Sequence, residues 1–306
     1  MSYVPLGRDE SATPMDQRGE ARLPRALASV VGNTMNLQRR PGFLDRLSFT
    51  AAITVASRTL ILRDRLMGKV RNDRLSGNFR HTTSRHSIAS GRERLDAIFG
   101  RPAGESACAA LLICHGIAET VEHWLAVQHL LAEHGVASLV FDYAGYGRST
   151  GTVRWEQCEN DAVAAFELLR ALAPDLEPSV LGFSMGTGVA AAILDRVSPK
   201  HLVLCGAFTS FQAAACAIGV PKRFAFAVPP IWNTLESLRR CPSPPLIIHC
   251  EQDRLFPQQM ALDLATCCQA PAQLVIVPNH QHSEPFYRPR LSYWGTVIRR
   301  LVSDIR

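Results

Sequence analysis

The chain has 306 residues, 47% of them hydrophobic and 20% charged, which is enough apolar material for a folded core. Its net charge of +6 is uneven: residues 1–85 hold fifteen basic and seven acidic residues, and residues 86–306 hold eighteen and twenty. The basic part could attract phosphate groups without sequence preference, but no recognition module or aromatic platform accompanies it, so a specific nucleic-acid partner is not expected.

The first 85 residues divide into two predicted segments. Residues 1–42 are rich in Arg, Gly, Pro and small polar residues and are predicted to be a flexible basic tail. Residues 43–85 form an extension in which apolar residues alternate with arginines, which predicts an amphipathic helix. Its apolar stretch contains Arg58 and is shorter than the roughly 20 residues that cross a bilayer. We therefore expect the helix to pack on the core or a partner, or to touch an anionic membrane surface peripherally.

The globular part is predicted to start at His86 with a strand pair over residues 86–90 and 94–99. The next apolar run, residues 109–114, is typical of a buried strand and ends at His115-Gly116-Ile117. Glycine there lets the backbone approach a substrate closely. His115 is expected to brace the loop.

A helical pattern over residues 121–134 leads to a strand at 138–141 and then to the glycine-rich loop from Asp142 to Ser149. The spacing of this loop fits neither a phosphate-binding P-loop nor an EF-hand. The pattern of residues 155–173 predicts the next helix.

The pentapeptide Gly182-Phe183-Ser184-Met185-Gly186 lies between a strand-like run at 179–181 and a helix predicted over 188–197. Gly-x-Ser-x-Gly between a strand and a helix is the signature of a nucleophile elbow, a turn too sharp for large side chains at either glycine. The pattern predicts an exposed, nucleophilic Ser184.

After a strand at 201–205, residues 206–241 are apolar, aromatic and broken by prolines. About 35 residues are too few for a separate domain, so the segment is predicted to be a short lid or pocket wall. Phe226 and Trp232 would suit an acyl group there, and ordinary core packing is the alternative.

Two further strands are expected to bring partners to Ser184. Residues 245–250 lead into the loop that carries Asp253, and residues 273–277 lead into the loop with His280 and His282. A serine needs an imidazole to take its proton, and the imidazole needs a carboxylate to hold its tautomer. Either His280 or His282 could be the base. We favour His282 because a strand, a short loop, His, a small polar residue and an acid is the usual pattern, and His280 would then be a neighbouring loop residue. Glu236 and Glu251 are rivals of Asp253 that fall outside the expected strand-end loop.

Strands that alternate with helices, including those predicted at 258–268 and 289–305, favour an α/β fold with a mostly parallel, doubly wound sheet over 86–306. The chain resembles the α/β-hydrolases in the order and spacing of five landmarks. These are Cys114-His115-Gly116, the loop at 140–149, the elbow, Asp253 and His282. The resemblance is to the branch with a small lid that contains acyl-protein thioesterases, monoacylglycerol lipases and proline iminopeptidases. It implies that the amides of Ile117 and Met185 form the oxyanion hole, and that Asp142 and Arg148 brace a loop beside the pocket.

The function expected from these patterns is hydrolysis of a carboxylic ester or thioester through an acyl-enzyme. One alternative is an aminopeptidase of the proline iminopeptidase type, with Glu119 and Glu122 as candidates to hold the amino terminus. A non-catalytic binding protein with this fold is another. No metal cluster or dinucleotide fingerprint is present, so no cofactor is implied. Nine cysteines without a paired framework, and no apolar secretory segment in the first 20 residues, suit a cytoplasmic protein.

Overall fold

The computed structural model describes residues 81–104, 106–117, 119–287 and 289–303. The predicted tail, residues 1–42, and all but the last five residues of the predicted extension, 43–85, lie outside this range. No described helix combines the length and the hydropathy that a membrane span requires.

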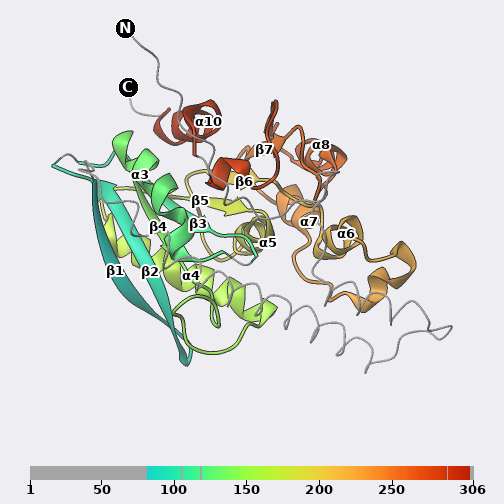
Figure 1. Cartoon of the computed structure of the whole chain (residues 1–306), viewed down its shortest axis with the longest axis horizontal. Helices are drawn as coiled ribbons and strands as arrows, with labels where there is room; N and C mark the ends of the chain where they lie inside the picture. Colours follow the sequence, from blue (N-terminus) through green and yellow to red (C-terminus); the bar gives the residue numbers. More distant parts are fainter. Residues whose placement is uncertain (1–80, 105, 118, 288, 304–306) are drawn as a thin grey trace, which may run out of the picture.

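An eight-stranded sheet organises these residues, in the order β1-β2-β4-β3-β5-β6-β7-β8 (Figure 1). β2 runs antiparallel to both of its neighbours, and β3 to β8 run parallel to one another. The strands are β1 His81–Ser90, β2 Glu93–Pro102, β3 Ala109–Cys114, β4 Val136–Phe141, β5 Pro178–Phe183, β6 Leu202–Cys205, β7 Leu246–Cys250 and β8 Gln273–Val277.

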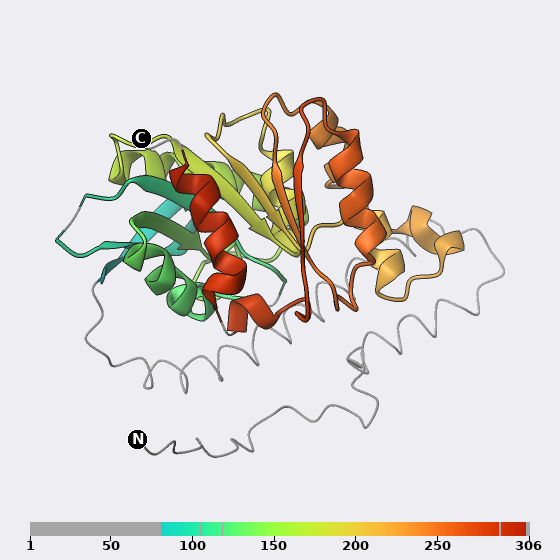
Figure 2. The ribbon, with the colours of Figure 1, turned by 90° about the horizontal axis from the view of Figure 1, so that it is seen from above.

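Helices cover both faces of the sheet (Figure 2). Side chains of α3, α9 and α10 pack into one core cluster, and those of α4, α5 and α8 pack into the other. The helical elements are η1 Val121–Trp124, α3 Leu125–Glu133, α4 Trp155–Leu172, α5 Met185–Ala192, α6 Phe211–Ala217, η2 Lys222–Ala227, α7 Thr234–Arg239, α8 Gln258–Cys267, α9 Glu284–Tyr287 and α10 Leu291–Val302.

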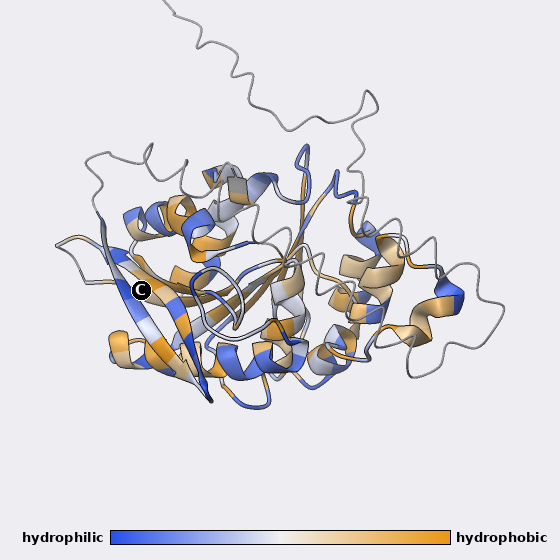
Figure 3. Ribbon diagram, turned by 60° about the horizontal axis from the view of Figure 1, so that its bottom comes forward, coloured by the Kyte–Doolittle hydropathy of each residue, from blue (hydrophilic) through white to orange (hydrophobic). Residues whose placement is uncertain are grey.

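The central strands read as continuous apolar runs because both of their faces are covered. In β3 every residue is buried. Leu111 and Ile113 face the cluster of α3 and α10, and Leu112 and Cys114 face the cluster of α4 and α5. Figure 3 shows the same arrangement, with hydrophobic strands inside and hydrophilic residues on the outer helices. The predicted α/β fold with a mostly parallel sheet is confirmed.

Several element boundaries differ from the prediction by a few residues, and those of β1 and α5 bear on the site and its surroundings. β1 begins at His81, so residues 81–85, which we assigned to the helical extension, form strand instead. Their side chains are mostly exposed at the sheet edge. They are identified as strand by their pairing with β2, whose register runs from His81 opposite Pro102 to Ser90 opposite Glu93. Helix α5 begins at Met185, three residues earlier than expected.

Candidate active site

Ser184 occupies a sharp turn between β5 and α5. It is only 8% exposed, so the prediction of an exposed serine is wrong: residues around the turn cover it. Its φ of 52° lies in the left-handed region that a serine rarely adopts, and its backbone N–H donates to the carbonyl of Cys205 on the neighbouring strand (2.9 Å). A Cβ at Gly182 would lie 2.4 Å from the carbonyl oxygen of Gly186, and one at Gly186 would lie 1.9 Å from that of Cys114. Both glycines are thus required for the turn, which has the geometry of a nucleophile elbow.

The amides of Met185 and Ile117 remain the predicted donors to a developing oxyanion. Met185 is the first residue of α5, so its N–H has no acceptor within the helix. Ile117 follows Gly116 on the loop after β3, and its side chain is exposed. The N–H of Gly116 itself already donates to Glu119 Oε2 (2.8 Å). This leaves the Ile117 amide as the candidate on this loop.

Glu119 holds the loop that carries Ile117. Its Oε2 atom accepts from the Gly116 amide and from the indole N–H of Trp124 (3.0 Å), and the side chain is buried. A Cβ at Gly116 would lie 2.7 Å from Glu119 Oε1, so the carboxylate packs directly on the backbone of the loop. The sequence offered this residue only as a substrate-binding acid, whereas the structure shows that it braces the loop.

Asp253 follows the carboxyl end of β7, and its side chain is fully buried. Oδ1 accepts from the amides of Leu255 (2.8 Å) and Phe256 (2.9 Å), which fixes the carboxylate on its loop. Burial opposes ionisation of Asp253, but the hydrogen bond and charge of His282, together with these two amides, outweigh it and lower the pKa of the carboxyl group. Asp253 is therefore an anion at neutral pH.

His282 lies against Asp253 although 29 positions separate the two in sequence. The ring Nδ1–H donates to Asp253 Oδ2 at 2.6 Å, and a carboxylate partner fixes the proton on Nδ1 and leaves Nε2 as the basic atom. Nε2 is buried and makes no hydrogen bond to any described residue.

The imidazole of His282 is placed beside the elbow by three neighbours. Its ring lies 5.6 Å, centroid to centroid, from Phe183, the residue before Ser184, and 5.3 Å from Phe256. A Cβ at Gly206, directly after β6, would lie 2.8 Å from the ring atom Cε1. The sequence gives no local signal that Gly206, Phe183 and Phe256 surround the base, because only the fold brings them to His282.

The rivals of these two residues are engaged elsewhere. His280 is half-buried, and its Nδ1–H donates to the carbonyl of Pro278 (2.7 Å). Glu251 accepts from the amide of Asn279, and Glu236 pairs with Arg239 and Arg240 on the surface. The structure thus joins Asp253 to His282 by a hydrogen bond, and among the described residues it shows no hydrogen bond from His282 to Ser184 or to either glutamate.

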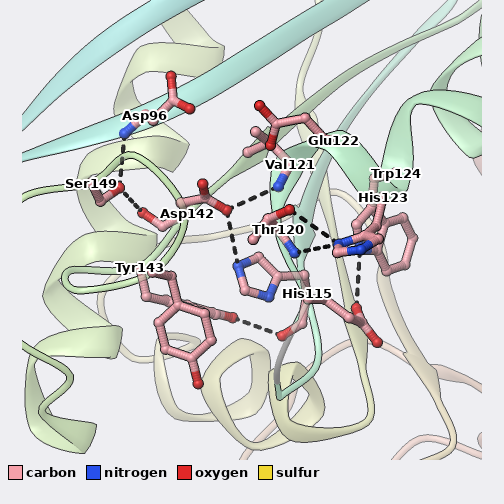
Figure 4. Close-up of polar contacts among 12 residues, drawn as sticks. Asp96, His115, Thr120, Val121, Glu122, His123, Trp124, Asp142, Tyr143 and Ser149 are labelled. Carbon is pink, nitrogen blue, oxygen red and sulfur yellow. Dashed lines mark hydrogen bonds and ion pairs between the residues drawn. The ribbon is translucent and has the colours of Figure 1, made fainter. Parts of the chain in front are cut away.

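The loop from Asp142 to Ser149 is built around the buried carboxylate of Asp142 (Figure 4). Oδ1 accepts from the amide of Val121 (2.9 Å), and the Ser149 hydroxyl donates to the Asp142 carbonyl (2.6 Å). His115 Nε2 lies 3.7 Å from Asp142 Oδ1. Burial raises the pKa of the Asp142 carboxyl group and lowers the pKa of the His115 imidazole to about 3. These contacts match the bracing roles predicted for His115 and Asp142. The Arg148 side chain pairs with Glu122 instead (3.7 Å).

The two predicted substrate-binding aromatic residues occupy different surroundings. Trp232 is only 4% exposed and packs against Trp155 and Phe211, so its position fits the core-packing alternative. Phe226 is 41% exposed on η2. The structure does not bring either ring to His282 or Asp253 through a ring or polar contact, and their substrate contacts stay predictions.

The described residues contain no group of three or more His, Cys, Asp or Glu side chains arranged to hold a metal ion. All nine cysteines are free thiols. Ser184, His282 and Asp253 offer a hydroxyl group, an imidazole and a carboxylate.

Comparison with protein families gives a match over part of the chain. Residues 105–243 match the model of the family described as serine aminopeptidase, S33. This range contains the Ile117 loop and the elbow, and it ends before Asp253 and His282.

Curated relatives include proteins with and without an assigned activity. The uncharacterized protein YfhR of Salmonella typhi is 29% identical over 61% of this chain and 68% of its own length. The lysophosphatidylserine lipase ABHD12 of Macaca fascicularis is 28% identical over 68% of this chain and 58% of its own length. The chain thus spans little more than half of that lipase.

Solved structures share the fold. The esterase Pf2001 of Pyrococcus furiosus superposes with a TM-score of 0.57 at 18% identity, over 72% of this chain and 91% of its own. Est1E of Butyrivibrio proteoclasticus, solved with ferulic acid bound, gives a TM-score of 0.57 at 21% identity, over 71% of this chain and 96% of its own.

Proposed function

We propose that this chain, which belongs to the α/β-hydrolase superfamily, is a serine hydrolase that cleaves a carboxylic ester or thioester through an acyl-enzyme on Ser184. The observation that carries the proposal is the 2.6 Å hydrogen bond from His282 to Asp253, beside an elbow in which Ser184 has a φ of 52°. A buried carboxylate on one imidazole nitrogen, with the other nitrogen unpartnered, is the arrangement that a general base requires.

In the first step, the Ser184 hydroxyl attacks the substrate carbonyl carbon while His282 Nε2 takes the hydroxyl proton. Asp253 stabilises the imidazolium that forms, because its carboxylate is ionised and held by two amides as well as by Nδ1–H. The carbonyl oxygen gains negative charge and is bound by the N–H groups of Ile117 and Met185. Such donors typically contribute about 3 to 4 kcal/mol each to transition-state stabilisation.

Collapse of the tetrahedral intermediate releases the alcohol or thiol, which receives the proton from His282. The acyl group then remains on Ser184 Oγ. A water molecule, activated by the same Nε2 atom, attacks this ester, and the serine is regenerated when His282 returns the proton.

An ester or thioester is favoured over an amide because its leaving group needs less protonation. The relatives support the same direction, since ABHD12 carries the name lysophosphatidylserine lipase and the structural neighbour Pf2001 carries the name esterase.

The aminopeptidase alternative is favoured by the name of the matching family, serine aminopeptidase. It requires a free carboxylate for the substrate amino group. Glu119 is occupied by Gly116 and Trp124, and Glu122 pairs with Arg85 and Arg148. Neither acid offered by the sequence is therefore available, which supports the esterase proposal.

The test is turnover of a short-chain aryl ester by the full chain and by Ser184→Ala. The proposal predicts steady turnover by the wild type and loss of at least about 10³-fold in the variant. An aminoacyl arylamide is assayed in parallel, and faster cleavage of the arylamide than of the ester would favour the aminopeptidase. Equal ester turnover by the two chains would refute the role of Ser184.

A further inference from the structure

The lid tip, defined here as residues 218–227 between α6 and α7, presents cations and apolar side chains together on the surface. It consists of the turn after α6 and the helix η2, and it lies at the opposite end of the molecule from β1 and β2 (Figure 1). Lys222 and Arg223 are exposed, and Ile218 and Phe226 are 36% and 41% exposed. Two of the six large apolar side chains that the described residues leave exposed thus lie within this ten-residue segment, together with both of its cations.

A small core of its own holds the lid tip in shape. Val220 and Val228 are buried with Ala215 of α6, and Phe224 packs against them. The Val220 amide donates to the Ala215 carbonyl (3.0 Å), and the Gln212 side chain donates to the Val228 carbonyl (3.2 Å). The outward side chains are therefore displayed on a folded unit.

The geometry of η2 sorts these side chains by face. In a 3₁₀ helix residues i and i+3 lie above one another. Phe224 and Ala227 share the inward face, whereas Arg223 and Phe226 share a face on which both side chains are exposed. The Arg223 guanidinium also lies 4.9 Å from the ring centre of Phe224. Arg223 and Phe226 thus project from the same outward face of η2.

The charge of this region has one sign. Residues 206–235 contain Lys222 and Arg223 and no aspartate or glutamate. Neither cation forms an ion pair with any described residue. Both side chains are exposed, so the described part of the chain leaves their charges accessible to an anion.

We infer that the lid tip docks on the surface of an anionic phospholipid bilayer. Phe226 and Ile218 would enter the boundary between headgroups and acyl chains, while Lys222 and Arg223 bind lipid phosphates and carboxylates, the combination that characterises interfacial segments. The segment that carries the tip starts at Gly206, which packs on His282. Docking would bring the candidate active site to the lipid surface.

The test is co-sedimentation of the full chain with vesicles of phosphatidylcholine alone or of phosphatidylcholine with phosphatidylserine. All chains carry Ser184→Ala, so that vesicle lipids stay intact and the result does not depend on the proposed hydrolysis. We expect binding to the phosphatidylserine vesicles, reduced about tenfold or more by Lys222→Glu with Arg223→Glu, and about tenfold by Phe226→Ser.

Two matched controls separate docking from general charge or surface effects. Arg92→Glu with Arg101→Glu changes the net charge equally, on the distant β1–β2 edge, and Leu262→Ser removes a 37% exposed apolar side chain from α8. We expect both control variants to bind vesicles like the parent chain. The unfolding midpoint is expected to be unchanged in the two lid variants and in the two control variants. The inference would be overturned if the parent chain bound neither kind of vesicle, as expected for a lid that docks on an acidic protein. It would also be overturned if the lid variants and the control variants lost vesicle binding equally.

Discussion

The Nδ1–H group of His282 donates a 2.6 Å hydrogen bond to Oδ2 of Asp253, and this bond fixes which nitrogen of the imidazole can act as a base. Nε2 is the atom left for Ser184, and it is buried without a hydrogen-bond partner among the described residues. The first prediction follows from this tautomer.

Asp253→Asn is expected to reduce kcat for an aryl ester by about 10⁴-fold, the loss known when the aspartate of a serine-protease triad is replaced in this way. An asparagine presents an N–H group or an uncharged carbonyl to Nδ1, so the imidazole is no longer held as a base and its protonated form loses its counter-charge. Steady-state kinetics check this, with the unfolding midpoint as the control for folding. A kcat within a few-fold of wild type would show that another acid orients His282.

Gly206→Ala is expected to lower kcat by about 10²-fold, because the new Cβ would lie 2.8 Å from His282 Cε1 and would displace the base. Gly91→Ala is the matched control: Gly91 has a φ of +59°, close to the +61° of Gly206, but a Cβ there meets nothing within 4 Å. Both variants carry the same backbone strain, and only Gly206→Ala should lose activity. Equal kcat values for the two would contradict this placement of His282.

Glu119→Ala is expected to reduce kcat about tenfold or more, less than the 10²- to 10³-fold loss of a whole oxyanion donor. The variant removes the acceptor of the Gly116 amide and so frees the loop that carries Ile117. Glu119→Gln keeps an oxygen at that position and should restore most of the activity. If the glutamine variant is as impaired as the alanine variant, the charge of Glu119 matters rather than its hydrogen bond.

The pKa of Asp253 gives a prediction on stability. Its folded-state pKa is lowered below the ordinary value of 3.8, so the unfolded chain binds more protons than the folded chain in acid. The resulting stabilisation is present above about pH 4 and is lost as pH falls through the folded-state pKa.

We therefore expect the free energy of unfolding to fall more steeply with acid in wild type than in Asp253→Asn, over about pH 2 to 5. Urea titrations at a series of pH values measure both slopes. Parallel slopes would mean that the carboxyl group titrates alike in the folded and unfolded chains.

Much of the sheet could be predicted from the sequence because its central strands are buried on both faces. Residues 109–114 and 245–250, for example, are apolar runs bounded by loop residues, and they form β3 and β7. The elbow was predictable for a similar reason, since the close contacts of Gly182 and Gly186 exclude other residues. These signals are local.

The differences arise where distant parts of the chain decide the outcome. The first residues of β1, from His81 to Arg85, are polar, and their strand is defined by pairing with β2. Helix α5 includes Gly186 and Gly188, poor helix formers that are tolerated because they pack against Cys114 and Trp232. Trp232 belongs to an aromatic cluster with Trp155 of α4, which the sequence of the lid segment alone does not indicate.

Reaction of the full chain with a fluorophosphonate probe, followed by identification of the modified peptide, tests the central claim most directly, because only an activated serine is expected to react rapidly. We predict a single rapid adduct on Ser184 in the wild-type chain, a much slower reaction in His282→Ala, and no adduct at this site in Ser184→Ala. An unmodified wild-type chain, or labelling at another residue that persists in Ser184→Ala, would contradict the account.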